Sequence, residues 1–216
     1  MSIADWKSIQ RCAGVKPDGV PVAKTADAIM RKAKILPFTR LDLQGGGVAA
    51  ATGMVTGSAS NIRRIFVHCS ATRVGQDIDA ATIRRWHLAK GWRDIGYHFV
   101  IRLDGSIERG RPENVPGSHV AGFNTGSIAL VYIGGLDAQG QPADTRTPAQ
   151  LEAMERLVRE LSQAYPDAEI LGHRDVSPDR DGDGKVERHE WLKACPCFDV
   201  RAWWSGHNST SERSLS

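Results

Sequence analysis

The stretch Ile65–Ser70, with the sequence IFVHCS, decides the fold. Its three apolar residues follow Arg63 and Arg64 and precede polar residues. A short apolar run with such boundaries is typical of a buried strand. His68 is therefore expected at the end of a strand, where the edge of a sheet meets its loops. This position makes His68 the first candidate functional residue.

Two further apolar runs have the same pattern, Tyr97–Ile101 and Ile128–Ile133. The turn signals Asp104-Gly105 and Gly134-Gly135 follow them, as expected at the ends of strands. Helical patterns lie between these runs. Strands that alternate with helices favour an α/β fold built on a central sheet.

The clearest helix begins after Thr147. Thr147 and Gln150 form a capping-box pair, and Pro148 stands at the first helical position. An apolar stripe at three- and four-residue spacing follows and is expected to be buried: Leu151, Met154, Leu157, Val158 and Leu161. A second helix is predicted over 80–90, with Ile83 and Trp86 facing the interior.

Composition excludes several classes of protein. The 216 residues include 28 basic and 25 acidic side chains, a net charge of +3 that gives no reason to expect a nucleic-acid partner. An apolar run of about 18 residues, which a membrane-spanning helix needs, is absent. The first residues, MSIADWKSIQR, lack the apolar core of a secretory signal. Four cysteines in 216 residues do not make a disulfide scaffold.

The chain divides into four parts by composition. Residues 1–43 are expected to form a small helical segment. Residues 44–60 are rich in small residues and almost uncharged, which indicates a flexible linker. The main domain is expected over 61–208, and residues 209–216 are expected to form a disordered tail.

Three residues have side chains that suit a zinc ion: His68 and His173, each expected at the end of a strand, and Cys195, which follows them in the chain. Two imidazoles and a thiolate are common zinc ligands, and three protein ligands leave a fourth position for water. In the sequence, 105 positions separate the two histidines and 22 separate His173 from Cys195. The residues alone therefore leave a second interpretation open, in which two loop-end histidines and one buried thiol are structural.

Seven motifs in a fixed order carry a family resemblance. They are His68–Thr72 (HCSAT), Trp86-His87, Gly91–Phe99 (GWRDIGYHF), Asp104-Gly105, Gly117–Asn124 (GSHVAGFN), Gly172-His173 and Lys193–Asp199 (KACPCFD). Together they resemble the zinc-dependent N-acetylmuramoyl-L-alanine amidases of bacteriophages, whose fold is similar to that of animal peptidoglycan recognition proteins. The resemblance covers about residues 62–204.

The resemblance implies a fold, a site and an activity. The fold would be α/β, with a central mixed β-sheet flanked by helices. Zinc would be held by His68, His173 and Cys195, in preference to Cys197, which stands at a variable position of the motif. The resemblance further implies roles for four residues: Tyr97 and Lys193 as catalytic side chains, and His119 and Asn124 as substrate-binding residues in a loop that lines the groove.

The implied function is that of a phage endolysin that hydrolyses the amide between N-acetylmuramic acid and L-alanine through zinc-activated water. Such a protein is made in the host cytoplasm without a signal peptide, acts on the cell wall in the periplasm, and depends on a holin or another export route. The segment 1–43 resembles part of a peptidoglycan-binding module. Two alternatives remain open, a non-catalytic peptidoglycan recognition protein and a regulator of a phage RNA polymerase.

An acidic segment between His173 and Lys193 matches a twelve-residue EF-hand calcium loop over 179–190. Glycine stands at its sixth position, and Ser177-Pro178 replaces an entering helix. The alternative is a solvated acidic turn. The expected calcium ligands are Asp179, Asp181, Asp183, Lys185 through its backbone carbonyl, Glu187 and Glu190. A bound ion would fold this insertion and hold Lys193 and Cys195 in place.

Overall fold

The computed structural model describes residues 54–212. The helical segment predicted over 1–43 lies outside these residues, as do most of the predicted linker and residues 213–216.

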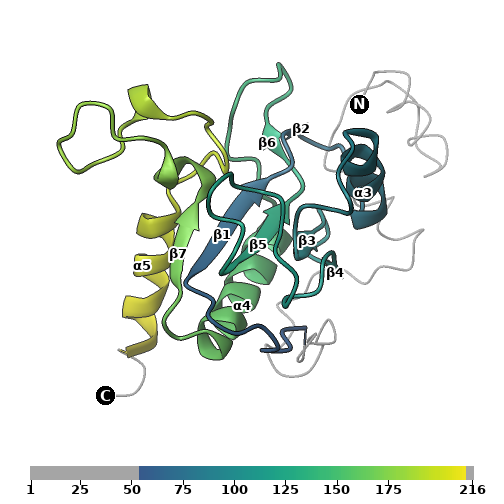
Figure 1. The fold of residues 1–216 in the computed structure, drawn as a ribbon. Coiled ribbons are helices and arrows are strands. Elements are labelled where there is room, and N and C mark those ends of the chain that lie inside the picture. The colour runs from purple at the N-terminus through teal and green to yellow at the C-terminus, as the bar shows by residue number, and fades with distance from the viewer. Residues whose placement is uncertain (1–53, 213–216) are drawn as a thin grey trace, which may run out of the picture. The chain divides into compact units, whose positions relative to one another are not determined.

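A five-stranded mixed sheet forms the centre of the domain, with the strand order β4-β3-β5-β1-β7 (Figure 1). β1 pairs in parallel with both β5 and β7, β3 pairs in parallel with β5, and β4 is antiparallel to β3. A separate pair, β2 and β6, lies beyond the ends of β1 and β5. The strands span Arg64–Cys69 (β1), Thr72–Arg73 (β2), Phe99–Ile101 (β3), Ile107–Arg109 (β4), Ser127–Tyr132 (β5), Gly135–Leu136 (β6) and Glu169–Gly172 (β7).

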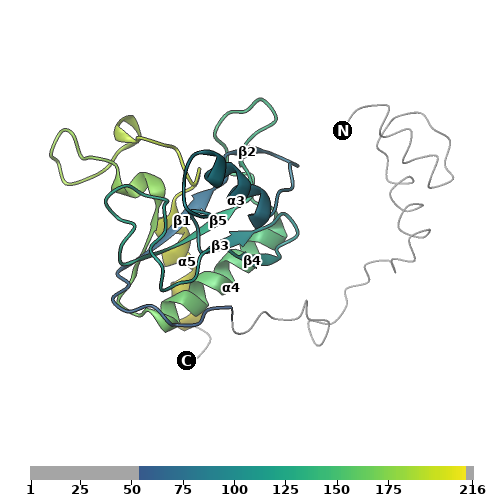
Figure 2. The same cartoon turned by 45° about the vertical axis from the view of Figure 1, so that its right-hand side comes forward.

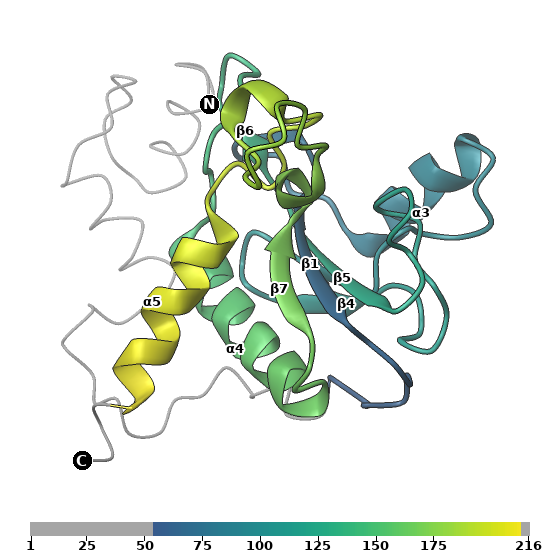
Figure 3. The same ribbon diagram turned by 60° about the vertical axis from the view of Figure 1, so that its left-hand side comes forward.

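Helices cover both faces of the sheet, as Figure 3 shows. They span Ala80–Ala89 (α3), Pro148–Ala164 (α4) and Val200–Glu212 (α5), so that α5 continues past the boundary predicted at 208. α4 and the start of α5 pack on one face against residues such as Ile65 and Leu130. α3 packs on the other face, against Val100 and Val131. Strands buried on both faces are apolar throughout, which explains why the β1 and β5 stretches are continuous apolar runs.

The helix predicted after Thr147 is α4, and its capping box is present. Thr147 accepts a hydrogen bond from Gln150 N, and the Gln150 side chain accepts one from Thr147 N. The predicted buried stripe is wrong at Leu151, which is 37% exposed. Gln150 is buried instead, because its side-chain amide donates hydrogen bonds to Ile101 O and Ile133 O at 3.2 and 2.9 Å.

The helix predicted over 80–90 is α3, and one of its two inward residues differs. Ile83 is buried, but Trp86 is 43% exposed. His87 takes the inward position, since its Nδ1 accepts a hydrogen bond from Gly96 N at 2.9 Å. The buried face of α3 therefore consists of Ala80, Ile83 and His87, and Trp86 lies at the surface.

Residues 54–60, which the sequence assigns to the linker, contact the domain. Met54, Val55 and Ala59 pack against the main core. The buried carboxylate of Glu113 accepts hydrogen bonds from Thr56 N at 2.8 Å and Gly57 N at 3.2 Å. These contacts fix the start of the described chain on the domain.

The parallel strands determine where functional residues gather. β1, β5 and β7 all end at the same edge of the sheet, and this carboxyl edge is where open α/β sheets bind their ligands. The loop that follows β7, yellow-green in Figures 1 and 2, projects from the body of the domain near this edge. Among the described residues, no helix has the length and apolar character needed to cross a bilayer.

Candidate metal centre

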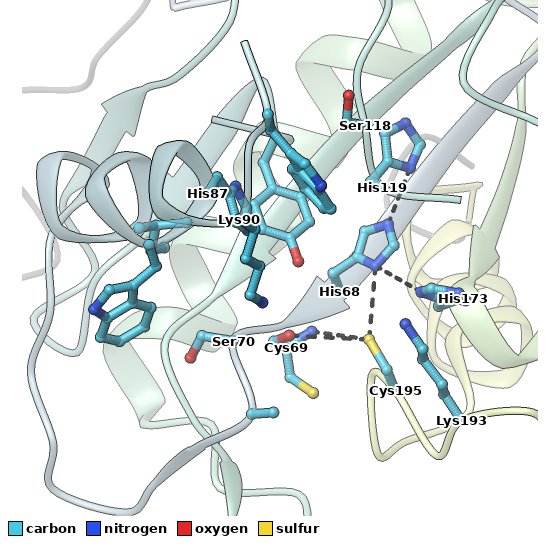
Figure 4. A pocket seen from close by; sticks show the side chains of 15 residues that line it. His68, Cys69, Ser70, His87, Lys90, Ser118, His119, His173, Lys193 and Cys195 are labelled. Carbon is cyan, nitrogen blue, oxygen red and sulfur yellow. Dashed lines mark hydrogen bonds between the residues drawn. The ribbon is translucent and has the colours of Figure 1, made fainter. Parts of the chain in front are cut away.

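His68, His173 and Cys195 lie together at the carboxyl edge of the sheet (Figure 4). His68 Nδ1 is 3.2 Å from His173 Nδ1 and 3.6 Å from Cys195 Sγ. His68 is 1% exposed, and the other two residues are half-buried. The structure thus brings together the three residues that the sequence marks as candidate zinc ligands.

The three donor atoms lie within 4.8 Å of one another, and the two separations from His68 fit a tetrahedral zinc ion. Zinc–nitrogen bonds of about 2.05 Å and zinc–sulfur bonds of about 2.3 Å place neighbouring donors about 3.3 Å (N to N) and 3.6 Å (N to S) apart. The observed separations from His68 Nδ1 are 3.2 and 3.6 Å. Two imidazoles and one thiol also leave a tetrahedral ion one open position, as catalytic zinc sites require.

Strand register explains how residues 105 positions apart become neighbours. β1 and β7 are parallel, with Val67 opposite Gly172, and a histidine follows each of these residues, His68 within β1 and His173 directly after β7. Gly172 has to lack a side chain, because a Cβ there would lie 2.7 Å from Cδ of Pro196. Glycine therefore lets the loop that carries Cys195 pack directly against the end of β7.

Hydrogen bonds from three directions hold the Cys195 loop. Arg174 N donates to Cys195 O at 2.9 Å, and the buried Tyr132 hydroxyl donates to Pro196 O at 2.7 Å. Cys69 N points at Cys195 Sγ from 3.3 Å. Cys197 Sγ turns away from the metal group and donates to Gly135 O at 3.2 Å. This arrangement favours Cys195 over Cys197 as the sulfur ligand.

Burial keeps the two ligand histidines neutral. It lowers the pKa of His68 well below its usual value, and the pKa is lowered further by His119, His173 and Lys193. Burial, together with the charge of Lys193, lowers the pKa of His173 to about 4. Neutral rings have a free nitrogen lone pair at neutral pH, which is what metal binding requires.

A cavity of about 310 Å³ opens over the three residues. Tyr97 lines it, and burial, with Cys195 and Cys69 nearby, raises the pKa of this phenol well above its usual value. Tyr97 therefore keeps its proton, which leaves its hydroxyl able to donate a hydrogen bond into the cavity. Lys193 is exposed and stands beside Cys195 at the rim, where it supplies a positive charge (Figure 4).

A second cavity, of about 510 Å³, continues from the first and shares Trp92, Ser118, His119, His173 and Lys193 with it. Asn124 lines this part, but its Oδ1 already accepts hydrogen bonds from His119 N at 2.8 Å and Val120 N at 3.0 Å. Asn124 thus shapes the loop that forms the wall of the groove. His119 also lines both cavities and is 9% exposed.

The sequence motifs predicted no functional role for four residues that line these cavities: Trp86, Lys90, Trp92 and Leu192. Trp86 and Trp92 belong to motifs that carry the resemblance, so a signal for them was present. Leu192 is 62% exposed at the end of the acidic insertion, and only the fold shows that it reaches the groove.

The acidic insertion contains two overlapping groups of potential metal ligands. Asp179, Asp181 and Asp183 form an exposed group, and Asp181 also lies near Glu187, His189 and Glu190. Glu190 is fully buried, and its carboxylate accepts hydrogen bonds from Arg180 N at 2.5 Å and Glu187 N at 3.0 Å. Lys185 donates its backbone N–H to Asp183 Oδ1 at 2.9 Å. Glu190 thus connects the two ends of the loop.

Comparisons with known proteins identify the family of this chain. Residues 58–189 match the family model of N-acetylmuramoyl-L-alanine amidases. The endolysin of Klebsiella phage KP32 is 44% identical over 141 residues, which cover 65% of this chain and 84% of the relative. The endolysin of Escherichia phage T7 is 40% identical over 150 residues, which cover 69% and 90%.

A solved amidase structure has a similar fold. The N-acetylmuramoyl-L-alanine amidase LysC from Clostridium intestinale superposes with a TM-score of 0.52 at 27% identity, covering 68% of this chain and 86% of that one. This confirms the predicted α/β fold with a mixed sheet and flanking helices. The matched family model covers more than half of the sequence and includes both His68 and His173. The chain therefore belongs to the N-acetylmuramoyl-L-alanine amidase family.

Proposed function

We propose that this endolysin-type amidase hydrolyses the amide between N-acetylmuramic acid and L-alanine at a zinc ion held by His68, His173 and Cys195. The observation that carries the proposal is the donor geometry, 3.2 Å between the two imidazole nitrogens and 3.6 Å from nitrogen to sulfur, on the wall of an open cavity. A zinc ion bound there would supply a Lewis acid that acidifies water and polarises the substrate carbonyl.

Two side chains of the cavity would stabilise the charge that develops on the carbonyl oxygen. Tyr97 has a phenol that stays protonated and donates a hydrogen bond to this oxygen. Lys193 adds a positive charge at the open rim, where solvent weakens its field. Of the described residues that line this cavity, none is an aspartate or glutamate. The proton acceptor for water is therefore not a carboxylate of this wall.

The groove formed by the two cavities suits a sugar linked to a short peptide. Trp86 and Trp92 offer aromatic faces to a sugar ring or an alanine methyl group. Lys90 and Lys193 offer positive charge to the carboxylates of a stem peptide. The Gly117–Asn124 loop would guide substrate past the metal, with Asn124 holding the loop in shape.

Mass spectrometry of digested peptidoglycan tests the activity. The zinc-loaded protein should release stem peptides with a free L-alanine amino terminus and leave glycan strands that keep the lactyl group. Cut glycan strands with intact stems would contradict the amidase assignment. A protein that stays on the wall without releasing products would be a recognition protein instead.

A matched pair of cysteine variants tests the ligand set. Cys195→Ser should lose zinc and activity together, because serine is a much weaker zinc ligand than thiolate. Cys197→Ser should keep both, since the Cys197 thiol faces Gly135 O. Full zinc content and activity in Cys195→Ser would overturn the ligand assignment.

We propose that the protein is made in the host cytoplasm and reaches the wall through a holin or another export route.

We also propose that residues 1–43 add affinity for the wall. In a sedimentation assay with purified sacculi, the inactive full-length Cys195→Ser protein should bind more tightly than the same protein truncated to 54–216. Equal binding would contradict this role.

We also propose that the insertion over 179–190 binds calcium. Three aspartates place carboxylate oxygens within 4.8 Å of one another. Burial and the negative charges of Asp183 and Asp181 raise the pKa of Glu187. Carboxylates crowded in this way repel one another, and a divalent cation would relieve the repulsion.

Isothermal titration of the zinc-loaded protein with calcium tests this site. One bound ion and a higher Tm are expected, and Asp179→Asn/Asp181→Asn should abolish both effects. Asp137→Asn, in a turn outside the insertion, is the matched control. Absence of binding at millimolar calcium would mean that the segment is a solvated acidic turn.

A further inference from the structure

A buried chain of polar side chains lies behind the metal centre, on the side of His68 that faces away from Cys195. His68 Nε2 is 3.2 Å from His119 Nδ1, and His119 Nε2 is 3.1 Å from Ser127 Oγ. Figure 4 shows His119 on the opposite side of the His68 ring from His173 and Cys195. All three members of the chain are at most 9% exposed.

The direction of these hydrogen bonds follows from Ser127. Its Oγ lies 2.6 Å from Phe123 O and 3.2 Å from Asn124 O, and a carbonyl can only accept. The single hydroxyl proton of Ser127 is therefore donated to Phe123 O, and Oγ can only accept from His119. His119 then carries its proton on Nε2 and has a lone pair on Nδ1.

The same reasoning continues to His68. Because His119 Nδ1 can only accept, His68 has to donate a proton from Nε2 across the 3.2 Å contact. The lone pair of His68 is then on Nδ1, the nitrogen that faces His173 and Cys195. With the opposite tautomer, an N–H would point into the metal site.

We propose that Ser127 and His119 are positioning residues, which set the tautomer and ring orientation of His68 so that its Nδ1 is open to zinc. The proposal rests on the zinc site proposed above. It also gives His119 a role other than the expected one in substrate binding, since both of its ring nitrogens are engaged inside the protein. Partners behind a metal-bound histidine typically change metal affinity by 10- to 100-fold when removed.

The fold holds this chain rigidly. Ser127 is the first residue of β5, opposite Arg64 of β1, so it belongs to the same sheet as His68. The His119 backbone N–H is held by Asn124 Oδ1, and the ring of Phe66 lies 5.5 Å from the His119 ring. The chain therefore connects two strands and one loop, without a solvent-exposed member that could reorient freely.

Zinc affinity, measured by competition with a chelator, tests the proposal without relying on activity. His119→Phe keeps a ring but removes the acceptor, and it should weaken zinc binding 10- to 100-fold. His119→Asn keeps an acceptor oxygen near the position of Nδ1 and should restore most of the affinity. Ser127→Ala should weaken binding and Ser127→Thr should not.

Another buried histidine supplies the matched control. His98 Nδ1 accepts a hydrogen bond from Ala129 N at 2.9 Å, and its Nε2 lies 3.1 Å from Val115 O, so His98 makes no hydrogen bond to His68. His98→Phe should therefore lower thermal stability and leave zinc affinity unchanged. If it weakens zinc binding as much as His119→Phe, general loosening of the core explains the effect and the proposal fails.

Nitrogen NMR of the histidine rings reports which ring nitrogen of His68 carries the proton. A purely structural role of His119 would not change this. In the wild-type protein, His68 should carry its proton on Nε2 both with and without zinc. In zinc-free His119→Phe this preference should be lost. A proton on His68 Nδ1 in the zinc-free wild type, or wild-type zinc affinity in His119→Phe, would overturn the proposal. Failure of the zinc site itself is distinguishable, because then the wild type and Cys195→Ser would bind zinc equally weakly.

Discussion

The Tyr97→Phe variant separates catalysis from folding in this amidase. Within residues 54–212, the Tyr97 hydroxyl makes no hydrogen bond to the protein, although it lines the cavity over the metal ligands. Removing it therefore leaves no partner unsatisfied, and the free energy of unfolding should change by less than about 0.5 kcal/mol. Loss of one donor to a developing oxyanion costs about 10²- to 10³-fold in kcat, or about 2.7–4 kcal/mol.

The assay is the initial rate of release of L-alanine-terminated stem peptides from peptidoglycan, with zinc content measured on the same samples. Tyr97→Phe should lose 10²- to 10³-fold in kcat and keep its zinc. The matched control is Tyr165→Phe, whose hydroxyl donates to the buried Glu113 at 2.5 Å on the far side of the core. That variant should lose about 1.5 kcal/mol of stability with kcat unchanged. A kcat within about threefold of wild type in Tyr97→Phe would refute the oxyanion role.

Three further predictions follow from the structure. Lys193→Met should lower kcat by about 10-fold, less than Tyr97→Phe, because Lys193 is exposed and solvent screens its charge; a loss larger than that of Tyr97→Phe in the same rate assay would contradict this order. Burial lowers the pKa of His87 in the folded protein to about 4, below the value of about 6.5 in an unfolded chain. The unfolded state therefore binds more protons between these pH values, and stability should fall as the pH drops from 6.5 to 4, by up to about 1.4 kcal/mol per pH unit. In urea unfolding, the free energy of unfolding of His87→Gln should depend less on pH than that of the wild type. An equal pH dependence in the two proteins would contradict the role of His87. Glu113→Ala should lose about 2–4 kcal/mol in the same measurement, since it leaves Thr56 N and Gly57 N without their acceptor; an unchanged midpoint would show that this contact does not stabilise the domain.

Local patterns in the sequence were sufficient for the elements whose signals are local. β1 follows from one apolar run, and α4 follows from a capping box and a spaced stripe. The errors at Leu151 and Trp86 have a common cause. In each helix a neighbouring polar residue is buried by hydrogen bonds to a distant segment, Gln150 to two strand carbonyls and His87 to Gly96 N. A pattern of hydrophobic residues contains no information about such partners.

Prediction of the metal site depends both on the sequence motifs and on the topology of the sheet. The residue types of His68, His173 and Cys195 suggested zinc, but spacing alone left a structural interpretation open. The sequence spacing did not show whether the two histidines lie close together. The parallel pairing of β1 with β7 answers this, because it makes them neighbours. The partner of His119 could not be predicted in this way, since the contact depends on how a loop folds over the end of β1.

The position of the acidic insertion limits what calcium can do to the amidase. The insertion lies between His173 and Cys195 in the chain, so its conformation bears on the position of the sulfur ligand. Two hydrogen bonds close its base, Leu192 N to Ser177 Oγ at 3.1 Å and Arg174 N to Cys195 O at 2.9 Å. The Cys195 position is therefore fixed by contacts that do not include the aspartates at the tip. Calcium should accordingly stabilise the insertion and the nearby Leu192 wall of the groove, and zinc affinity should change little when calcium is removed.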